Sequence, residues 1–284
     1  MSLQCYTKHF HAMGGPCEFR FSCSSKSQAE HLFSLAHNEV IRLEQKYSRY
    51  RDDSIVQQIN LSHQLIALDD ETKAILDYAN TAYQISDGLF DITTGVLRRL
   101  WDFNSDKIPS SQAIAELLPS IGWSKIFYSA SKIQVPEGMQ IDFGGIVKEY
   151  ASDAVKTLLI EQGLTHGLIN LGGDISAINQ QPSTPWPIGV RDAKDPQKPS
   201  HKILLDNESI ATSGNYERFI EVNGKRYCHI LNPKTGFPVE NASSVSVVAP
   251  HCVIAGTLST VAMLLPLDQA KELLDESGMK YLIQ

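Results

Sequence analysis

Residues 209–239 read SIATSGNYERFIEVNGKRYCHILNPKTGFPV, and they join an ordinary β-hairpin to two groups of polar side chains. FIEV alternates apolar with polar residues, Asn223-Gly224 is a strong signal for a tight turn, and KRYCHIL alternates back. The hairpin is expected to bring two sets of polar residues together: Thr212, Ser213 and Gly214 on one side, and His229, Asn232, Thr235 and Gly236 on the other. A hydrophobic core does not need such a set, so the stretch predicts a binding or catalytic site.

The composition is that of an ordinary globular protein with a substantial core. The chain has 284 residues, of which 42% are hydrophobic and 20% charged, enough for one large domain or two joined ones. The formal net charge of −7 argues against a nucleic-acid partner or an anionic membrane surface. No apolar run approaches the length of a membrane span, so we expect none.

The cysteines indicate reduced thiols. There are five, an odd number, and none stands in a CxxC pair. Together with the lack of a visible signal peptide, this predicts a cytoplasmic protein.

Helical patterns dominate the first part of the chain. Residues 17–24 alternate as a strand, and Ser27-x-x-Glu30 is a capping box that predicts a helix to about Tyr47. A second helix is expected after Asp70, and residues 89–120 have the composition of short helices with turns.

Strand patterns dominate from residue 125 onward. Expected strands before and after the hairpin are 125–128, 132–135, 166–171, 175–178, 187–192, 202–206, 243–249 and 279–284. A long helix is predicted over about 146–162, and two more after Pro250 and Pro266. The pattern predicts an α+β fold with antiparallel sheets. We expect a single domain, 1–284, of two closely joined sub-parts with a helical segment at about 70–120.

The segment IDFGGIVKEYASD (141–153) is the best candidate for anion binding. It is expected to change from strand to helix across Gly144-Gly145, which exposes backbone N–H groups and the positive end of a helix dipole. Lys148 stands one turn into that helix. A plain glycine turn with a solvated lysine explains the same residues equally well.

Four other segments are individually weak. NLGGDI (170–175) is a glycine turn between strands, and in SDGLFDITTG (86–95) we favour Asp91 as a helix N-cap. The tyrosines of KYSRYRDDS (46–54) could stack on a flat heterocycle such as flavin, and the hydroxyls of AGTLST (255–260) are typical of helix caps. GxGxxG, GxxxxGK[ST], GxSxG and zinc-ligand spacings are all absent.

In combination these segments resemble the ApbE family of FAD:protein FMN transferases. The resemblance runs almost end to end and includes AMGGPCEF (12–19), KYSRYRDDSIVQQIN (46–60), SDGLFDITTGVL (86–97), IDFGGIVKEYASD (141–153), HGLINLGGDI (166–175), PWPIGV (185–190), IATSGNYER (210–218), HILNPKTGFPV (229–239) and CVIAGTLSTVAML (252–264).

The resemblance implies a duplicated, T-fold-like α+β architecture with FAD bound in a cleft. With Mg²⁺, such enzymes split FAD, release AMP and attach FMN to a Thr or Ser of an acceptor flavoprotein that carries a flavinylation motif. It implies these FAD-binding residues: Met13, Tyr50, Leu89, Phe90, Asp91, Asp142, Lys148 and Ile230. The Gly145 carbonyl and the Thr260 hydroxyl are expected metal ligands, and His229 and Lys148 the catalytic residues.

Three positions depart from the family pattern. Asn232 replaces an Asp, Glu149 replaces a Gly, and Gly256 stands where a metal-binding Asp is expected. Either a neighbouring acid such as Glu149 or Asp174 compensates, or the protein binds or hydrolyses FAD without transfer. A redox flavoprotein is a poorer alternative. If the metal site is merely weak, Gly256→Asp is expected to strengthen it, and if a neighbouring acid already compensates, the substitution is expected to change little.

Overall fold

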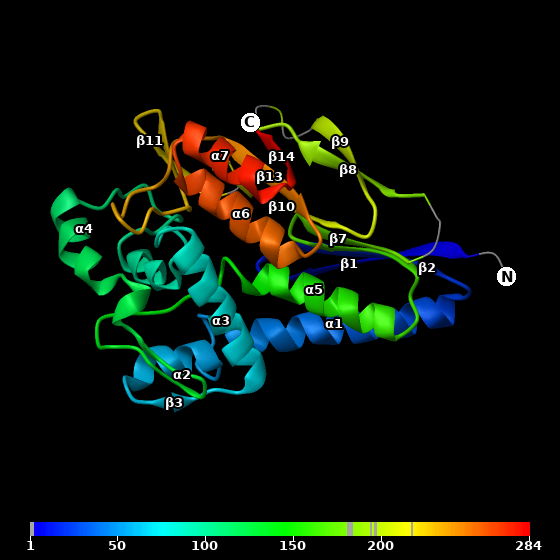
Figure 1. Ribbon diagram of the computed structural model, residues 1–284, viewed down its shortest axis with the longest axis horizontal. Helices are drawn as coiled ribbons and strands as arrows, with labels where there is room; N and C mark the ends of the chain where they lie inside the picture. Colours follow the sequence, from blue (N-terminus) through cyan, green and yellow to red (C-terminus); the bar gives the residue numbers. More distant parts are fainter. Residues whose placement is uncertain (1–2, 181–183, 194, 196–197, 217) are drawn as a thin grey trace.

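A seven-stranded antiparallel sheet forms the centre of the structure, which is a computed structural model (Figure 1). The structure describes residues 3–180, 184–193, 195, 198–216 and 218–284. In spatial order the strands are β1 (Gln4–Ala12), β2 (Gly15–Cys23), β6 (His166–Leu171), β7 (Asp174–Asn179), β10 (Ser209–Gly214), β13 (Ser244–Ala249) and β14 (Lys280–Ile283). The predicted α+β class with antiparallel pairing is confirmed.

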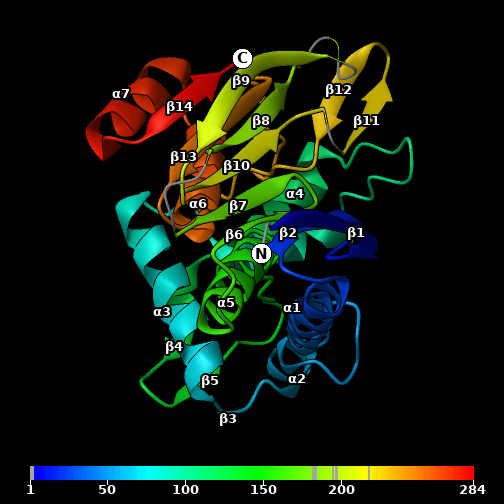
Figure 2. The same cartoon turned by 90° about the vertical axis from the view of Figure 1, so that its right-hand side faces the viewer.

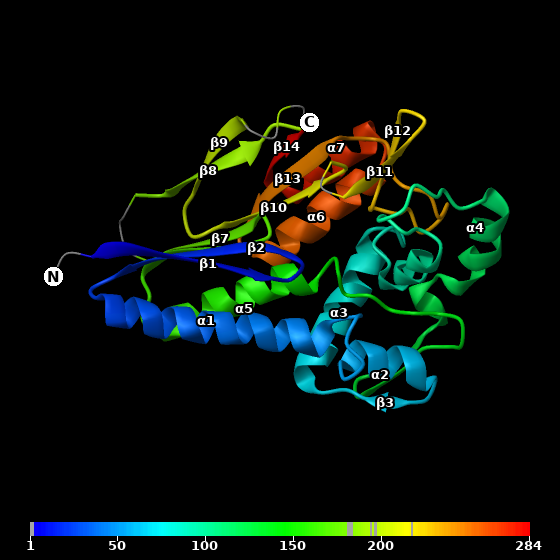
Figure 3. The same ribbon diagram turned by 180° about the vertical axis from the view of Figure 1, so that it is seen from behind.

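Four helices cover one face of this sheet (Figure 3): α1 (Lys26–Tyr47), α5 (Val147–Glu161), α6 (Cys252–Leu264) and α7 (Leu267–Ser277). Alternate residues of β2 point into this core, where the Phe21 ring stacks on Phe33 of α1 at 4.7 Å between centroids. No helix in the described ranges is both long and apolar enough to cross a membrane.

The opposite face is covered by the hairpin β8 (Trp186–Arg191) and β9 (Pro199–Leu205), as Figure 2 shows. Ile188, Val190 and Leu205 of this hairpin pack on Leu168 and Ile210 of the central sheet. The central strands are therefore covered on both sides, which explains the nearly continuous burial of β6, β10 and β13.

A helical segment lies against one end of the sheet (Figures 1 and 3). It comprises α2 (Ile55–Ser62), α3 (Asp70–Ile85), η1 (Ile92–Arg99), α4 (Ser111–Leu117), η2 (Leu118–Ser120), η3 (Trp123–Lys125) and a small sheet of β3 (Ile66–Ala67), β5 (Lys132–Gln134) and β4 (Phe127–Tyr128). Its position places η1 beside the loop that enters α5.

The predicted hairpin is confirmed as β11 (Phe219–Val222) and β12 (Lys225–Cys228), with Asn223 and Gly224 both at positive φ in the turn. Ile220 packs on Trp101 in the helical segment, and the Trp101 indole N–H donates to the Gly236 carbonyl at 2.9 Å. The stretch 209–239 therefore links the central sheet to the helical segment.

One sequence prediction about helix α1 is wrong, and two neighbouring elements were missed. The N-cap of α1 is Ser25, which accepts the Gln28 N–H at 3.2 Å, while the Gln28 side chain accepts the Ser24 N–H at 3.0 Å. The helix begins at Ser25-x-x-Gln28 and not at Ser27-x-x-Glu30, because the side chains of Ser25 and Gln28 accept the otherwise unpaired N–H groups of Gln28 and Ser24. Strand β1 and helix α2 were not predicted.

The expected strand before Gly144 is also absent, for an identifiable reason. The Asn60 side chain accepts the Ile141 N–H at 2.8 Å and donates to the Ile141 carbonyl at 2.9 Å. The Asp142 N–H donates to the Ile92 carbonyl at 2.8 Å. The buried Asn60 amide therefore makes the hydrogen bonds that a neighbouring strand would make to Ile141, and it fixes the loop that leads into α5.

Replacing Asn60 by alanine should loosen this loop. Asn60→Ala orphans a buried N–H and a buried C=O, so the free energy of unfolding should fall by about 2–4 kcal/mol. Urea denaturation measures the change, and Gln58→Ala, at an exposed position of the same helix, is the control. Equal stability of the two variants would contradict the role assigned to Asn60.

Candidate active site

The loop 142–145 is held in place by an ion pair. Asp142 Oδ2 lies 2.6 Å from Arg49 Nη1, and Asp142 Oδ1 accepts the Gly144 N–H at 2.9 Å. Arg49 also donates to the Gly95 carbonyl of η1. Both oxygens of Asp142 are therefore engaged in shaping the loop, which leaves its glycines exposed at the entrance to α5.

Lys148, in the first turn of α5, pairs with an acid of the neighbouring glycine turn. Its ammonium lies 2.7 Å from Asp174 Oδ2, and the Asp174 side chain is only 3% exposed. Asp174 Oδ1 accepts the Thr212 N–H at 3.2 Å. Through Asp174, the NLGGDI turn, the start of α5 and the end of β10 are joined at one place.

Cations from separate segments gather beside this junction. Arg218 donates to the Gly14 carbonyl at 3.1 Å, so it lies at the β1–β2 turn. Burial lowers the pKa of Arg98. Groups that interact electrostatically with Arg98 are Asp142, Tyr50, Arg49 and Arg218. In a protein of formal charge −7, this local positive cluster is suited to bind an anion.

His229 faces the same cluster as a neutral imidazole. Burial, then Arg98, and also Arg218 and Lys148, lower the pKa of His229 to about 4. Its Nδ1 lies 3.3 Å from the Arg218 carbonyl, which can only accept a hydrogen bond. The proton is therefore on Nδ1, and Nε2 keeps a lone pair that can accept a proton.

The segment 89–91 supplies apolar and structural groups. Leu89 and Ile230 are half-buried and pack on the same core cluster between α6 and β13. The buried Phe90 ring lies 3.5 Å from the position that a Cβ would take on Gly145. The sequence prediction of an Asp91 N-cap is confirmed, since Asp91 Oδ1 accepts the Thr93 N–H at 2.8 Å. Asp91 Oδ2 accepts the Trp123 N–H at 3.1 Å, so this side chain is occupied within the protein.

Two of the residues expected at FAD lie near the mouth of the site. Tyr50 is 84% exposed, and its ring lies 5.8 Å from the Arg49 guanidinium carbon. Met13 has a positive φ at the β1–β2 turn and donates its N–H to Glu44 Oε1 at 2.6 Å. An exposed aromatic ring beside a cation cluster is available for stacking on a flat ligand.

The hydroxyl groups of 209–214 bond to α6 and β13. Ser213 Oγ is 3.0 Å from Thr260 Oγ1 and 2.8 Å from Ser259 Oγ, and Thr212 Oγ1 is 2.8 Å from Ser246 Oγ. The Asn232 side chain does not bond to these hydroxyl groups and instead accepts backbone N–H groups of its own loop.

Asn232 accepts the Lys234 N–H at 2.8 Å and the Thr235 N–H at 3.2 Å. An amide oxygen performs this turn as well as a carboxylate, so the replacement of the expected Asp is structurally neutral.

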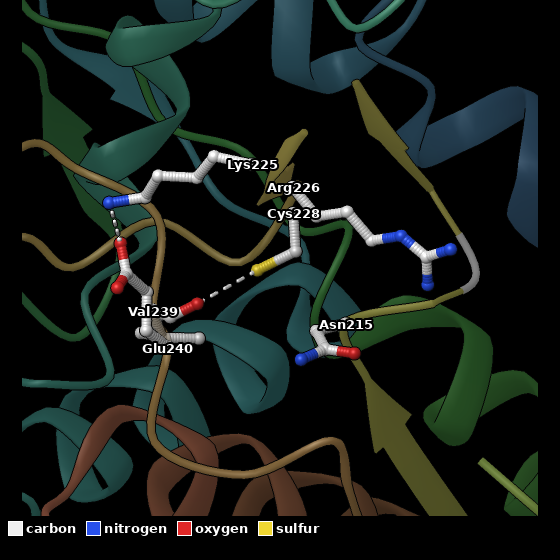
Figure 4. Close-up of a pocket in the computed structure, with 6 residues that line it drawn as sticks. All are labelled: Asn215, Lys225, Arg226, Cys228, Val239 and Glu240. Atoms are coloured by element: carbon white, nitrogen blue, oxygen red, sulfur yellow. Dashed lines mark hydrogen bonds and ion pairs between the residues drawn. The ribbon is translucent and has the colours of Figure 1, made fainter. Parts of the chain in front are cut away.

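A cavity of about 150 Å³ lies beside the β11–β12 hairpin (Figure 4). Lys225 and Glu240 form an ion pair at its edge at 2.7 Å, and the buried Cys228 thiol donates to the Val239 carbonyl at 3.4 Å. All five cysteines are free. The cavity is too small for a dinucleotide, and we assign the site to the cation cluster on chemical grounds.

Sequence reasoning missed Arg49, Arg98 and Arg218. They lie in three different segments, and none stands in a motif with anion-binding spacing. Only the fold, which brings Arg49, Arg98 and Arg218 together beside the start of α5, identifies them as one group.

Comparison with known proteins agrees with the resemblance seen in the sequence. The sequence model of the ApbE family matches residues 13–283, and the chain belongs to that family. It is 30% identical over 270 residues to the FAD:protein FMN transferase of Treponema pallidum, covering 87% of this chain and 74% of that one. It is 33% identical over 253 residues to that of Chlamydia pneumoniae, covering 81% and 78%. The crystal structure of the ApbE protein of Thermotoga maritima superposes with a TM-score of 0.91 at 28% identity, covering 99% and 94%.

The protonation of His229 provides a test of the cation cluster. Arg98→Met keeps most of the side-chain volume and removes the charge, so the pKa of His229 should rise from about 4 towards its ordinary value of 6.5. An NMR titration of the imidazole measures this pKa. Arg226→Met, on the exposed hairpin, is the matched control. An unchanged His229 pKa in Arg98→Met would show that Arg98 does not act on the imidazole.

Proposed function

We propose that this protein is an FAD:protein FMN transferase that uses FAD as its substrate. The observation that carries the proposal is the convergence of Arg98, Arg218 and Lys148 on a neutral His229 at the start of α5. Membership of the ApbE family, with relatives named for this activity, supports it.

The flavin end of FAD is assigned to the apolar side of the site. Leu89, Phe90 and Ile230 would contact the ring system, and Tyr50 would stack on it from the exposed side. The Asp91 side chain is already hydrogen-bonded within the protein, so it would act by fixing the turn that carries Leu89 and Phe90. Met13 would act through the conformation of the β1–β2 turn.

The pyrophosphate is assigned to the cation cluster. Lys148, Arg98 and Arg218 would neutralise its charge, and the N–H of the exposed Gly145 would donate to one of its oxygens. Asp142 acts indirectly in this arrangement, since it fixes the loop that presents that N–H group. Such prepositioned donors stabilise the charge that develops during phosphoryl transfer.

We assign to His229 the role of accepting the proton of the incoming hydroxyl group. The acceptor's Thr or Ser oxygen bonds to the phosphorus of the FMN half, the bond from that phosphorus to the bridging oxygen breaks, and AMP leaves with that oxygen. The hydroxyl proton passes to His229 Nε2, which is open because Nδ1 faces the Arg218 carbonyl. Bound pyrophosphate offsets the nearby cations, so it should raise the His229 pKa towards the working pH.

Magnesium fits the donor atoms at this site. The described residues offer oxygen donors, which Mg²⁺ prefers: the Gly145 carbonyl and the Thr260 hydroxyl, with the acids Glu149 and Asp174 close by. One carboxylate oxygen, Glu149 Oε2, is buried with no partner in the described part of the chain. When bound, Mg²⁺ would supply positive charge to the phosphate oxygens.

We also propose that the partner is a protein with an accessible Ser or Thr in a flavinylation motif, and that both proteins work in the cytoplasm. The five free cysteines support a reducing compartment.

Intact-mass analysis of an acceptor peptide tests the function. After incubation with the protein, FAD and Mg²⁺, the peptide should gain one FMN and AMP should be released, and EDTA should abolish both. Lys148→Ala should lower kcat/KM about a hundredfold, since it removes a charge-stabilising group. Lys202→Ala, at an exposed position of β9, should match the wild type.

Other outcomes favour other activities. Release of AMP without labelled peptide, for several acceptor sequences, would indicate an FAD pyrophosphatase. Tight FAD binding with neither product would indicate a flavin-binding protein without transfer.

A further inference from the structure

A buried carboxylate oxygen that has no hydrogen-bond partner among the described residues lies beside the site. Glu149, in the first turns of α5, is 7% exposed, and within the described ranges its Oε2 has no hydrogen-bond partner. Burying an ionised carboxylate without a partner is costly. The neighbouring buried carboxylate of Asp174 adds to that cost. A bound cation would remove it.

The charge balance around Glu149 also favours a cation. Asp174 is 2% exposed and shares this place, where it pairs with Lys148 at 2.7 Å. When both are ionised, the two carboxylates and the one ammonium carry one net negative charge in a buried position, which a divalent cation would compensate.

Gly256 creates the room that Glu149 occupies. A Cβ on Gly256 would lie 2.6 Å from Glu149 Cγ and 3.1 Å from Glu149 Oε1. Any side chain at position 256 would therefore displace the Glu149 carboxylate. The contact is fixed because Asp153, one turn along α5, accepts the Cys252 and Val253 N–H groups at 2.8 and 3.0 Å and so caps α6.

Hydroxyl oxygens lie on the same face of α6. Thr260 follows Gly256 by four residues, so the two share a helix face. Thr260 Oγ1 is 3.0 Å from Ser213 Oγ, and the N–H of the preceding Thr212 donates to Asp174. Carboxylate and hydroxyl oxygens are thus gathered from α5, β7, β10 and α6.

We propose that Glu149 and Asp174 bind the divalent cation of this protein, and that Gly256 is the residue that admits Glu149 to this position. The metal-binding carboxylate of Glu149 then comes from α5, and its side chain extends to Gly256 on α6. Gly256 is then a requirement of the site and not a defect, and Gly256→Asp should weaken metal binding, whereas the sequence suggested stronger binding or little change. The proposal rests on the proposed function only for the use of the metal in transfer, and cation binding itself is independent of it.

No third His, Cys, Asp or Glu joins these acids among the residues that the structure describes. Mg²⁺ commonly keeps several waters and is bound through one or two carboxylates plus phosphate oxygens, so two acids are sufficient.

The test is a titration with Mn²⁺, a cation of similar ligand preference, followed by the EPR signal of the free ion and without FAD. The wild type should bind one Mn²⁺, and Glu149→Gln should bind it about tenfold or more weakly. Gly256→Asp alone should also bind weakly, because Glu149 is displaced. The double variant Glu149→Gly/Gly256→Asp should regain affinity, because the acid then comes from α6 and has room. Glu161→Gln, at an exposed position of α5, is the matched control.

Thermal unfolding in EDTA and in Mn²⁺ checks folding. Each variant should unfold cooperatively in EDTA, and only those that bind Mn²⁺ should gain stability from it. Unchanged Mn²⁺ affinity in Glu149→Gln, tighter binding in Gly256→Asp alone, or no binding by the wild type would each overturn the proposal. Binding with these effects but without FMN transfer would instead contradict the proposed function and leave the metal site standing.

Discussion

The buried ion pair between Lys148 and Asp174 is the contact on which the site depends. An almost fully buried carboxylate must be paired, and removing either partner of such a pair is strongly destabilising. The pair fixes the first turn of α5 against the glycine turn between β6 and β7. The end of β10 bonds to this pair through Thr212, and Glu149 lies beside it.

The charge distribution explains how an acidic protein can bind a pyrophosphate. Three arginines reach the start of α5 from three separate segments, while the chain as a whole carries −7. Burial, together with Arg98, Arg218 and Lys148, keeps His229 neutral, and its Nε2 has a lone pair because the proton is on Nδ1. Anion binding and proton acceptance are therefore two consequences of one local field, and substrate binding would change both together.

Local patterns in the sequence were sufficient for most of the fold. Period-two alternation located most strands and the Asn223-Gly224 hairpin, and Asp91 and Lys148 lie where their motifs indicated. The features that the sequence did not reveal depend on contacts between residues that are far apart in the chain. The Asn60 amide replaces a strand partner for Ile141, and Glu149 fills the space over Gly256, although each pair is far apart in the chain. The sequence left open whether an acid such as Glu149 or Asp174 compensates for Gly256, and the proposed exchange of positions rests on the contact between Gly256 and Glu149.

Anomalous diffraction from a crystal grown with Mn²⁺ and FAD is the most direct measurement of the central claim, which is that the start of α5 holds both metal and substrate phosphates. We expect one strong peak in coordination with the Glu149 and Asp174 carboxylates, and the phosphates of FAD between that peak and the cluster of Arg98, Arg218 and Lys148. A peak remote from both carboxylates, or phosphates bound away from the cluster, would contradict the account.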